Sequence, residues 1–235
     1  MRLTHWLAGL ARKQPLSRRS TRRKWHGDLR PAVERLEDRT LLTAPHPFDL
    51  STLDGSNGFQ LNGTQQSDHS GYSVSTAGDI NGDGYDDIVV SSVFANNLEG
   101  VMYIIYGSAA PVSVDLALLD KSRGFELIGS GIGHFGMSVA GRIDINHDNI
   151  PDIVIGNPSG APDACAYAVL GSTRLLQSGY EYIEDVVRTG YDGFAMSTAR
   201  VGDDAGTIVA SIGDVNNDGF ADFAISASLD PTGGI

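Results

Sequence analysis

Short apolar runs alternate with clusters of Gly, Asp and Asn along most of the chain. Three of these runs, at residues 88–90, 153–155 and 223–225, are rich in Val, Ile and Phe and directly follow acidic segments. A second apolar run follows in the first two cases, at residues 101–106 and 165–170. Short runs of β-branched and aromatic residues between turn formers are typical of strands. The pattern therefore predicts an all-β fold.

The acidic segments are three copies of one nine-residue loop, beginning at Asp79, Asp144 and Asp214. Each copy has oxygen-bearing side chains at positions 1, 3, 5 and 9, and Gly or Asn at position 6. Calcium takes about six to eight oxygen ligands, and this spacing supplies several from one turn. The alternative is a metal-free turn, because Asp, Asn and Gly are common turn residues. Mutual repulsion of the clustered carboxylates favours a bound divalent cation.

The loops lie inside a longer repeat. Three Gly-Phe pairs, separated by 66 and then 69 residues, lie at residues 58–59, 124–125 and 193–194. A further glycine precedes each loop by eight residues, namely Gly71, Gly136 and Gly206. A fixed period of this length with about four short strands per copy is the signature of a propeller-like array.

This period divides the acidic part of the chain into two complete blades, residues 57–122 and 123–192, and one truncated blade, residues 193–235. Residues 45–56 form a linker before them. The third copy ends at Ile235, where the next apolar run begins in the first copy. Because propellers close with at least about four blades, we expect open sheet edges that invite self-association.

Position 12 after each loop start excludes two other calcium-binding families. An EF-hand has a bidentate Glu there and continues into a helix, whereas this chain has Val90, Ile155 and Ile225. The dockerin loop also opens a helix. The β-branched segments that follow these loops favour strands instead.

The units resemble FG-GAP repeats, the blades of the integrin α-subunit propeller and of related bacterial surface proteins. Phe135-Gly136 matches the FG element, and residues 156–158 stand where Gly-Ala-Pro would be. Gly71 and Gly206 lack the preceding Phe. The similarity covers residues 57–235 and implies a partial β-propeller of four-stranded blades, with calcium loops in turns between strands.

The resemblance also implies ligand roles for five residues of each loop. Positions 1, 3, 5 and 9 would give side-chain oxygens to Ca²⁺, and position 7 a backbone carbonyl. These residues are Asp79, Asn81, Asp83, Tyr85 and Asp87 in the first loop, Asp144, Asn146, Asp148, Ile150 and Asp152 in the second, and Asp214, Asn216, Asp218, Phe220 and Asp222 in the third. Position 6 needs a positive φ, which Gly takes freely and Asn tolerates.

Charge changes sign near residue 44. Residues 1–44 carry 11 of the 17 Lys and Arg residues and 4 of the 29 Asp and Glu residues. The rest of the chain therefore has 6 basic and 25 acidic residues, a net charge of −19. Such an acidic body would repel nucleic acid. No apolar run reaches the length of about 18 residues that a membrane span requires.

The basic segment 1–44 has three interpretations: a nucleic-acid arm, a disordered tail or an export segment. Residues 36–39, Leu-Glu-Asp-Arg, and the following Leu41-Leu42 resemble the LEPR-XLL-type motif that precedes large exported bacterial proteins, with Asp38 in place of Pro. This resemblance favours an extracellular or cell-surface protein. A standard signal peptide would need an apolar core of about 7–15 residues, which is missing ahead of Thr43.

The sequence contains no recognisable catalytic constellation. Residues 131–136 match the dinucleotide-binding glycine pattern, but that pattern has meaning only between a strand and a helix. A Gly-x-Ser-x-Gly elbow is absent. We therefore expect a non-enzymatic, calcium-binding segment that serves adhesion or binds a protein or cell-surface ligand. Two alternatives stay open: the propeller portion of a larger, phospholipase-like exported hydrolase whose catalytic domain is not in this chain, and a structural spacer.

Overall fold

The computed structural model describes residues 49–55, 57–131, 134–159, 164–198 and 204–227. They all belong to one compact unit, Asp49–Ile235. The basic segment 1–44 lies outside the described residues, so its assignment as an export segment stays a prediction.

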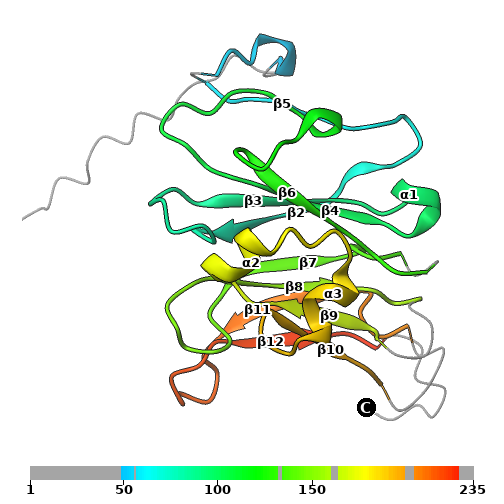
Figure 1. Ribbon diagram of the computed structural model, residues 1–235, viewed down its shortest axis with the longest axis vertical. Helices are drawn as coiled ribbons and strands as arrows, with labels where there is room; N and C mark the ends of the chain where they lie inside the picture. Colours follow the sequence, from blue (N-terminus) through cyan, green and yellow to red (C-terminus); the bar gives the residue numbers. More distant parts are fainter. Residues whose placement is uncertain (1–48, 56, 132–133, 160–163, 199–203, 228–235) are drawn as a thin grey trace, which may run out of the picture. The chain divides into compact units, whose positions relative to one another are not determined.

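The first four-stranded sheet has the strand order β2-β3-β4-β6, and every neighbouring pair is antiparallel (Figure 1). Its strands are β2 (Ser70–Gly78), β3 (Asp87–Ser92), β4 (Val101–Ile105) and β6 (Gly124–Ile128). The apolar runs at residues 88–90 and 101–106 form β3 and β4. Every residue of β4 is buried, because core side chains pack on both faces of the sheet. A strand buried on both faces reads as a continuous apolar run.

The second sheet repeats this arrangement with the order β7-β8-β9-β10. Its strands are β7 (Val139–Ile143), β8 (Asp152–Gly156), β9 (Ala166–Val169) and β10 (Gly193–Met196), again with antiparallel pairing throughout. All residues of β8 and β9 are buried. A third pair of antiparallel strands consists of β11 (Val209–Gly213) and β12 (Asp222–Ile225). The predicted all-β fold of propeller-type sheets is thus confirmed.

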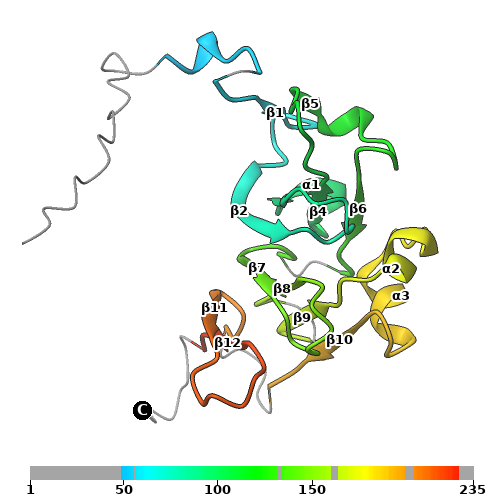
Figure 2. The same ribbon diagram turned by 90° about the vertical axis from the view of Figure 1, so that its left-hand side faces the viewer.

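The first strands of the three sheets are neighbours: β7 contacts both β2 and β11 (Figure 2). The main hydrophobic core lies between the first two sheets and includes Ile104 and Leu127 from one and Ile153 and Tyr167 from the other. A smaller core, with Val154 and Val209, joins the second sheet to the third. Apolar packing between successive sheets therefore holds the array together.

The sheets are offset by one strand from the sequence repeats. The Gly-Phe pair at residues 124–125 opens β6, which pairs with β4 and completes the first sheet. The pair at residues 193–194 likewise opens β10, which pairs with β9. The divisions drawn from the sequence at residues 123 and 193 thus precede the last strand of a sheet. This offset ties consecutive repeats together, because each one begins in the sheet of its predecessor.

Several short elements lie outside the two large sheets. They are η1 (Leu50–Thr52), β1 (Leu61–Asn62), α1 (Ala95–Leu98), β5 (Val114–Asp115) and η2 (Leu116–Leu118). β1 and β5 pair in parallel, and an isolated parallel bridge between Ile128 and Tyr182 makes the corresponding link one repeat later. In both repeats, a residue near the start of the repeat therefore pairs in parallel with the segment that follows the third strand of the sheet.

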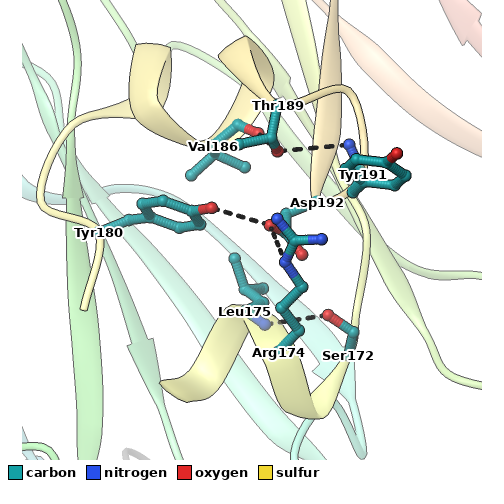
Figure 3. A network of polar contacts seen from close by, with 8 residues as sticks. All are labelled: Ser172, Arg174, Leu175, Tyr180, Val186, Thr189, Tyr191 and Asp192. Carbon is teal, nitrogen blue, oxygen red and sulfur yellow. Dashed lines mark hydrogen bonds and ion pairs between the residues drawn. The ribbon is translucent and has the colours of Figure 1, made fainter. Parts of the chain in front are cut away.

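Two helices, α2 (Thr173–Ser178) and α3 (Ile183–Arg188), connect β9 to β10, and the strand patterns did not predict them. A polar network around Asp192 fastens them to the sheet (Figure 3). The buried Asp192 carboxylate accepts a hydrogen bond from the Tyr180 hydroxyl at 2.9 Å and pairs with Arg174 Nε at 3.2 Å. The Arg174 guanidinium also lies 4.9 Å from the centre of the Tyr191 ring.

Candidate metal sites

The three acidic loops occupy the same place in their sheets. Each connects the first strand to the second, β2 to β3, β7 to β8 and β11 to β12. Position 9 is in every case the first residue of the second strand, namely Asp87, Asp152 or Asp222. The fold therefore presents the loops at equivalent strand ends, as the repeat predicts.

The first loop is a tight turn in which side-chain oxygens collect around backbone amides. The Asp79 carboxylate accepts hydrogen bonds from the amides of Asp83 and Gly84, both at 2.9 Å. Asn81 Oδ1 accepts a second bond from the Asp83 amide at 2.9 Å, and Asp83 Oδ1 accepts one from the Tyr85 amide. The side chains at positions 1, 3 and 5 are thus brought together in one turn.

The second and third loops reproduce these bonds. In the second, the Asp144 carboxylate accepts from the Asp148 and Asn149 amides, both at 3.0 Å. In the third, the Asp214 carboxylate accepts from the Asp218 and Gly219 amides at 3.1 and 2.9 Å. In all three loops the position-3 Asn side chain also donates to the position-5 carboxylate, at 2.8 or 2.9 Å. One sequence pattern therefore encodes one loop conformation three times.

Positive φ angles make this turn possible. Position 6 has a φ of 92° at Gly84, 66° at Asn149 and 93° at Gly219, which confirms the prediction that this position needs Gly or Asn. Position 4 is also left-handed, with a φ of 60° at His147, and the sequence reasoning did not identify that requirement. The non-glycine residues at these sites carry some backbone strain.

The position-9 carboxylate closes the loop from the strand side. Asp87 is fully buried, and its two oxygens accept hydrogen bonds from the Ile80 amide at 2.9 Å and the Gly107 amide at 2.7 Å. Asp152 is buried in the same way, with bonds from the amides of Ile145 and Gly171 at 2.7 and 2.8 Å. Asp222 accepts from the Val215 amide at 2.9 Å.

Sequence reasoning missed the two glycines that hold these carboxylates. Gly107 and Gly171 follow the third strand of each complete sheet, at 28 and 27 residues after the start of the respective loop. A Cβ at Gly107 would come within 2.4 Å of the Asp86 carbonyl oxygen, and one at Gly171 within 2.2 Å of the Pro151 carbonyl oxygen. Their recurrence at matching places in the repeat is the signal that could have revealed them.

Burial raises the pKa of Asp87 to about 6 and that of Asp152 to about 7. The hydrogen-bonding amides oppose this rise, while the negative charges at positions 1 and 5 add to it. In the third loop, the pKa of the exposed Asp214 is lowered, chiefly by the hydrogen bond from the Gly219 amide. The two complete sheets thus hold a carboxylate in surroundings that oppose its ionisation and that a cation would relieve.

Neighbouring loops touch one another. The Ala221 amide of the third loop donates to the Asp144 carbonyl of the second at 3.3 Å, and the rings of His147 and Phe220 lie 5.4 Å apart. The first loop contacts the second sheet, since Asp86 pairs with Arg142 of β7 at 3.1 Å, although both side chains are largely exposed. The loops consequently form one side of the array.

In the described ranges, the structure contains no group of three or more His, Cys, Asp or Glu side chains that could hold a metal ion by themselves. The ligand set implied by the repeat family is of another kind, because it includes an Asn amide and a backbone carbonyl in each loop. The predicted carbonyl donors Tyr85, Ile150 and Phe220 lie in the turn, where their amides donate to the position-5 carboxylate. The assignment of these residues as metal ligands stays a prediction.

A cleft of about 770 Å³ opens beside the first loop. Its walls come from Asp83 and Tyr85 of that loop, from Tyr106 after β4, and from Phe59 and Arg123 before β1 and β6. The cleft therefore places aromatic and charged side chains next to the loop.

Comparison with known proteins agrees with the repeat pattern. The FG-GAP repeat family matches residues 70–99 and 135–168. Integrin alpha pat-2 of Caenorhabditis briggsae is 36% identical over 115 residues, or 46% of this chain. Integrin alpha-6 of Gallus gallus is 37% identical over 101 residues, or 43% of the chain, and integrin alpha-11 of Homo sapiens is 30% identical over 104 residues, or 42%.

The aligned regions span only 8 to 9% of the length of these integrins. The similarity therefore concerns the repeats and not the whole of those proteins. Both stretches matched by the repeat family contain an acidic loop and the second strand that follows it. Over these two stretches, which lie in propeller-type sheets, the chain thus matches the FG-GAP repeat and is similar to integrin α-chains.

Proposed function

We propose that the chain is a calcium-binding, non-enzymatic propeller segment of an exported protein, and that it serves adhesion by binding a protein or cell-surface ligand. The observation that carries the proposal is the threefold repetition of one loop, with the same acidic side chains and the same hydrogen bonds. Similarity to integrin α-chains supports the adhesive role.

The donor chemistry of the loops fits calcium. Each loop offers carboxylate, amide and carbonyl oxygens, which are the hard ligands that Ca²⁺ prefers. A bound ion would supply positive charge where at least three carboxylates lie within nine residues. The side chains at positions 1, 3 and 5 accept hydrogen bonds from backbone amides of the turn. Position 9 is the first residue of the second strand and connects the turn to it. Extracellular modules of this type bind calcium with a Kd of roughly 10⁻⁴ to 10⁻³ M, which suits a structural role.

The raised pKa values of Asp87 and Asp152 invite a different explanation, because catalytic acids often have such values. Both side chains, however, are fully buried, and each oxygen accepts a hydrogen bond from a backbone amide. A general acid must reach its substrate, and these carboxylates face backbone instead. This environment favours a structural role for the two carboxylates over catalysis.

Export and a surface location are part of the proposal. The integrin α-chains that resemble this chain and the motif at residues 36–42 support them. None of the helices in the described residues has the length and apolar character to cross a bilayer. The cleft beside the first loop is a candidate surface for a ligand of the full protein.

Equilibrium dialysis of the purified chain against millimolar calcium tests the proposal. We expect up to three bound ions per chain, and one fewer after each of the substitutions Asp83→Ala, Asp148→Ala and Asp218→Ala. These position-5 side chains are exposed, so circular dichroism should show that the variants keep their strands. A folded parent chain that binds no calcium would refute the proposal.

A further inference from the structure

Position 4 of the acidic loop differs in one chemical respect between its three copies. It is Gly82 in the first loop, His147 in the second and Asn217 in the third. All three residues have a left-handed backbone, with φ angles of 75°, 60° and 59° respectively. Of the three copies, the first alone therefore has a glycine directly after the position-3 asparagine.

An Asn-Gly pair can lose its side-chain amide without an enzyme. The backbone nitrogen of Gly82 gives up its proton to solvent and attacks Asn81 Cγ, which forms the N–Cγ bond of a five-membered succinimide ring. The Cγ–Nδ2 bond breaks, and the amide nitrogen takes up a proton from solvent and leaves as ammonia. Water then opens the ring at either carbonyl. The product is an aspartyl residue, or an isoaspartyl residue whose main chain runs through Cβ and Cγ.

The loop activates the Asn81 side chain for this attack. Asn81 Oδ1 accepts a hydrogen bond from the Asp83 amide at 2.9 Å, and this donor stabilises the negative charge that develops on Oδ1 as the nucleophile adds. The leaving nitrogen, Nδ2, donates to the Asp83 carboxylate at 2.9 Å. Asn146 and Asn216 make the same two contacts, at distances between 2.8 and 3.1 Å. The three loops therefore share this activation and any restraint that it imposes.

The loops differ in the side chain of the attacking residue. Ring closure requires the Gly82 backbone to turn towards Asn81 Cγ, and glycine reaches backbone conformations that are closed to residues with a Cβ. Gly82 is exposed, and no described atom beyond its chain neighbours lies within 4 Å of a Cβ built on it. Packing therefore does not oppose the movement of its main chain. In the other two loops, the side chains of His147 and Asn217 hinder the nitrogen that must attack.

Two other Asn-Gly pairs occur in the sequence, at residues 57–58 and 62–63, and both of their glycines are packed. A Cβ on Gly58 would lie 2.7 Å from Leu53 Cδ2, and one on Gly63 would lie 2.7 Å from Ser70 Oγ. Asn62 also lies in β1, where it pairs with β5. Neighbouring atoms therefore restrict the backbone at these two pairs, in contrast to the open surroundings of Gly82.

We propose that Asn81 is a site of spontaneous deamidation in the folded chain, and that this modification selectively changes the first loop with time. An aspartyl product replaces the hydrogen bond from Asn81 Nδ2 to Asp83 by the contact of two carboxylates, which repel each other. An isoaspartyl product adds the Cβ methylene to the main chain of the turn. The hydrogen bonds from the Asp83 and Gly84 amides to Asp79 then cannot both keep their geometry. The proposal is independent of calcium binding and of the adhesive role.

Storage of the purified chain in mildly alkaline buffer, followed by digestion and fragmentation mass spectrometry, tests the proposal. Deamidation replaces the side-chain NH₂ by OH, so it raises the mass at the modified residue. We expect Asn81 to convert about tenfold faster than Asn146 and Asn216, which corresponds to a barrier lower by about 1.4 kcal/mol. Equal rates at the three asparagines would overturn the proposal.

Exchange of the position-4 residues gives two matched variants. Gly82→His should slow the conversion of Asn81 to the rate of Asn146, and it should fold because the equivalent left-handed position of the second loop holds a histidine. His147→Gly should speed the conversion of Asn146 by about tenfold. Circular dichroism checks that both variants keep their strands. An unchanged rate in either folded variant would overturn the proposal, because position 4 would then not control the reaction.

Calorimetry in a chelator measures the effect of the modification on the fold. The stored parent chain should have a lower Tm than the fresh chain, whereas the stored Gly82→His variant should keep its initial Tm. This variant also controls for slow changes elsewhere in the chain. A parent chain that converts at Asn81 without any change in Tm would overturn the inference that deamidation alters the first loop.

Discussion

At position 9 of the loops, a single carboxylate both closes a turn and joins strands. Asp87 bonds the Ile80 amide inside the loop and the Gly107 amide beyond β4. Asp83, by contrast, bonds only within its exposed turn. The two residues have the same side chain and the same proposed ligand role, but they differ in how far their contacts reach along the chain.

Replacing these two residues should therefore have different consequences. Asp87→Ala leaves two buried amides without an acceptor, and each costs about 1–3 kcal/mol, so it should lower the free energy of unfolding even in a chelator. Asp83→Ala should change that free energy little, yet should abolish calcium stabilisation at the first loop. Urea unfolding with and without calcium measures both effects. If both variants lost the same free energy of unfolding in the chelator, the buried hydrogen bonds of Asp87 would not contribute to stability.

The raised pKa values predict a pH dependence for the calcium-free chain. An unfolded Asp has a pKa near 3.8, whereas folded Asp87 and Asp152 have values of about 6 and 7. Between these values the folded state binds more protons than the unfolded state, so the free energy of unfolding should fall as pH rises from about 4 to about 7. The fall should be on the order of a few kcal/mol for the pair.

Urea titrations at several pH values in a chelator measure this dependence. The double variant Asp87→Asn and Asp152→Asn is the control, since it should lose most of the slope. A slope that is unchanged in the double variant would assign the effect to other groups.

At the scale of elements, the strands are held by contacts between sheets as much as within them. The glycine before each loop shows this clearly, because Gly71 and Gly136 share one backbone conformation but differ in surroundings. Gly136 faces Ser91 and Met102 of the preceding sheet, while space is open around Gly71. The same residue type thus has a conformational role at one place and an additional packing role at the other.

Substitution by alanine separates the two roles. Both Gly71→Ala and Gly136→Ala incur the strain of a positive φ, of order 1 kcal/mol. Gly136→Ala also forces its methyl group into Ser91 and Met102, which should add about 1–3 kcal/mol. Thermal and urea unfolding should therefore rank Gly136→Ala as the less stable variant. The reverse order would mean that the sheets do not approach each other at Gly136.

At the scale of the whole molecule, three equivalent loops lie on one side of an array whose sheets share cores. A ligand that binds these loops only in the folded state must stabilise the array by mass action. Contacts such as the bond from Ala221 to Asp144 join one loop to the next. A ligand that stabilises one loop should therefore also stabilise the neighbouring loop that is bonded to it.

Millimolar calcium should accordingly raise the Tm of the chain, by an amount that grows with calcium concentration. At a concentration of about 100 times Kd, one site contributes about 2.7 kcal/mol. The triple variant Asp83→Ala, Asp148→Ala and Asp218→Ala should keep its fold and lose the response. Differential scanning calorimetry with magnesium as the control ion measures this. The prediction fails if the triple variant responds to calcium as the parent chain does.

The sequence by itself determined the strands and the loops, because both are local. Runs such as residues 101–106 formed strands since their apolar residues need burial on both faces, and the loop conformation followed from Asp, Asn and Gly within nine residues. The repeat period also revealed the positions of Gly71, Gly136 and Gly206. Whether the loops bind calcium and whether the basic segment directs export stay predictions.

Only the tertiary structure decided the long-range pairings. The Gly-Phe pair at residues 124–125 joins the preceding sheet, because the exposed edge of β4 offers hydrogen-bonding partners that the pattern of a single strand cannot specify. The Asp87–Gly107 bond spans 20 residues. The Asp192 carboxylate contacts Arg174 of α2 and Tyr180 of the connection between α2 and α3. Exposure of Val74 beside burial of Val139 likewise follows from what packs on each sheet. Residues close in the sequence decide which segments form strands and turns, whereas contacts between residues far apart in the sequence decide which strands lie next to one another.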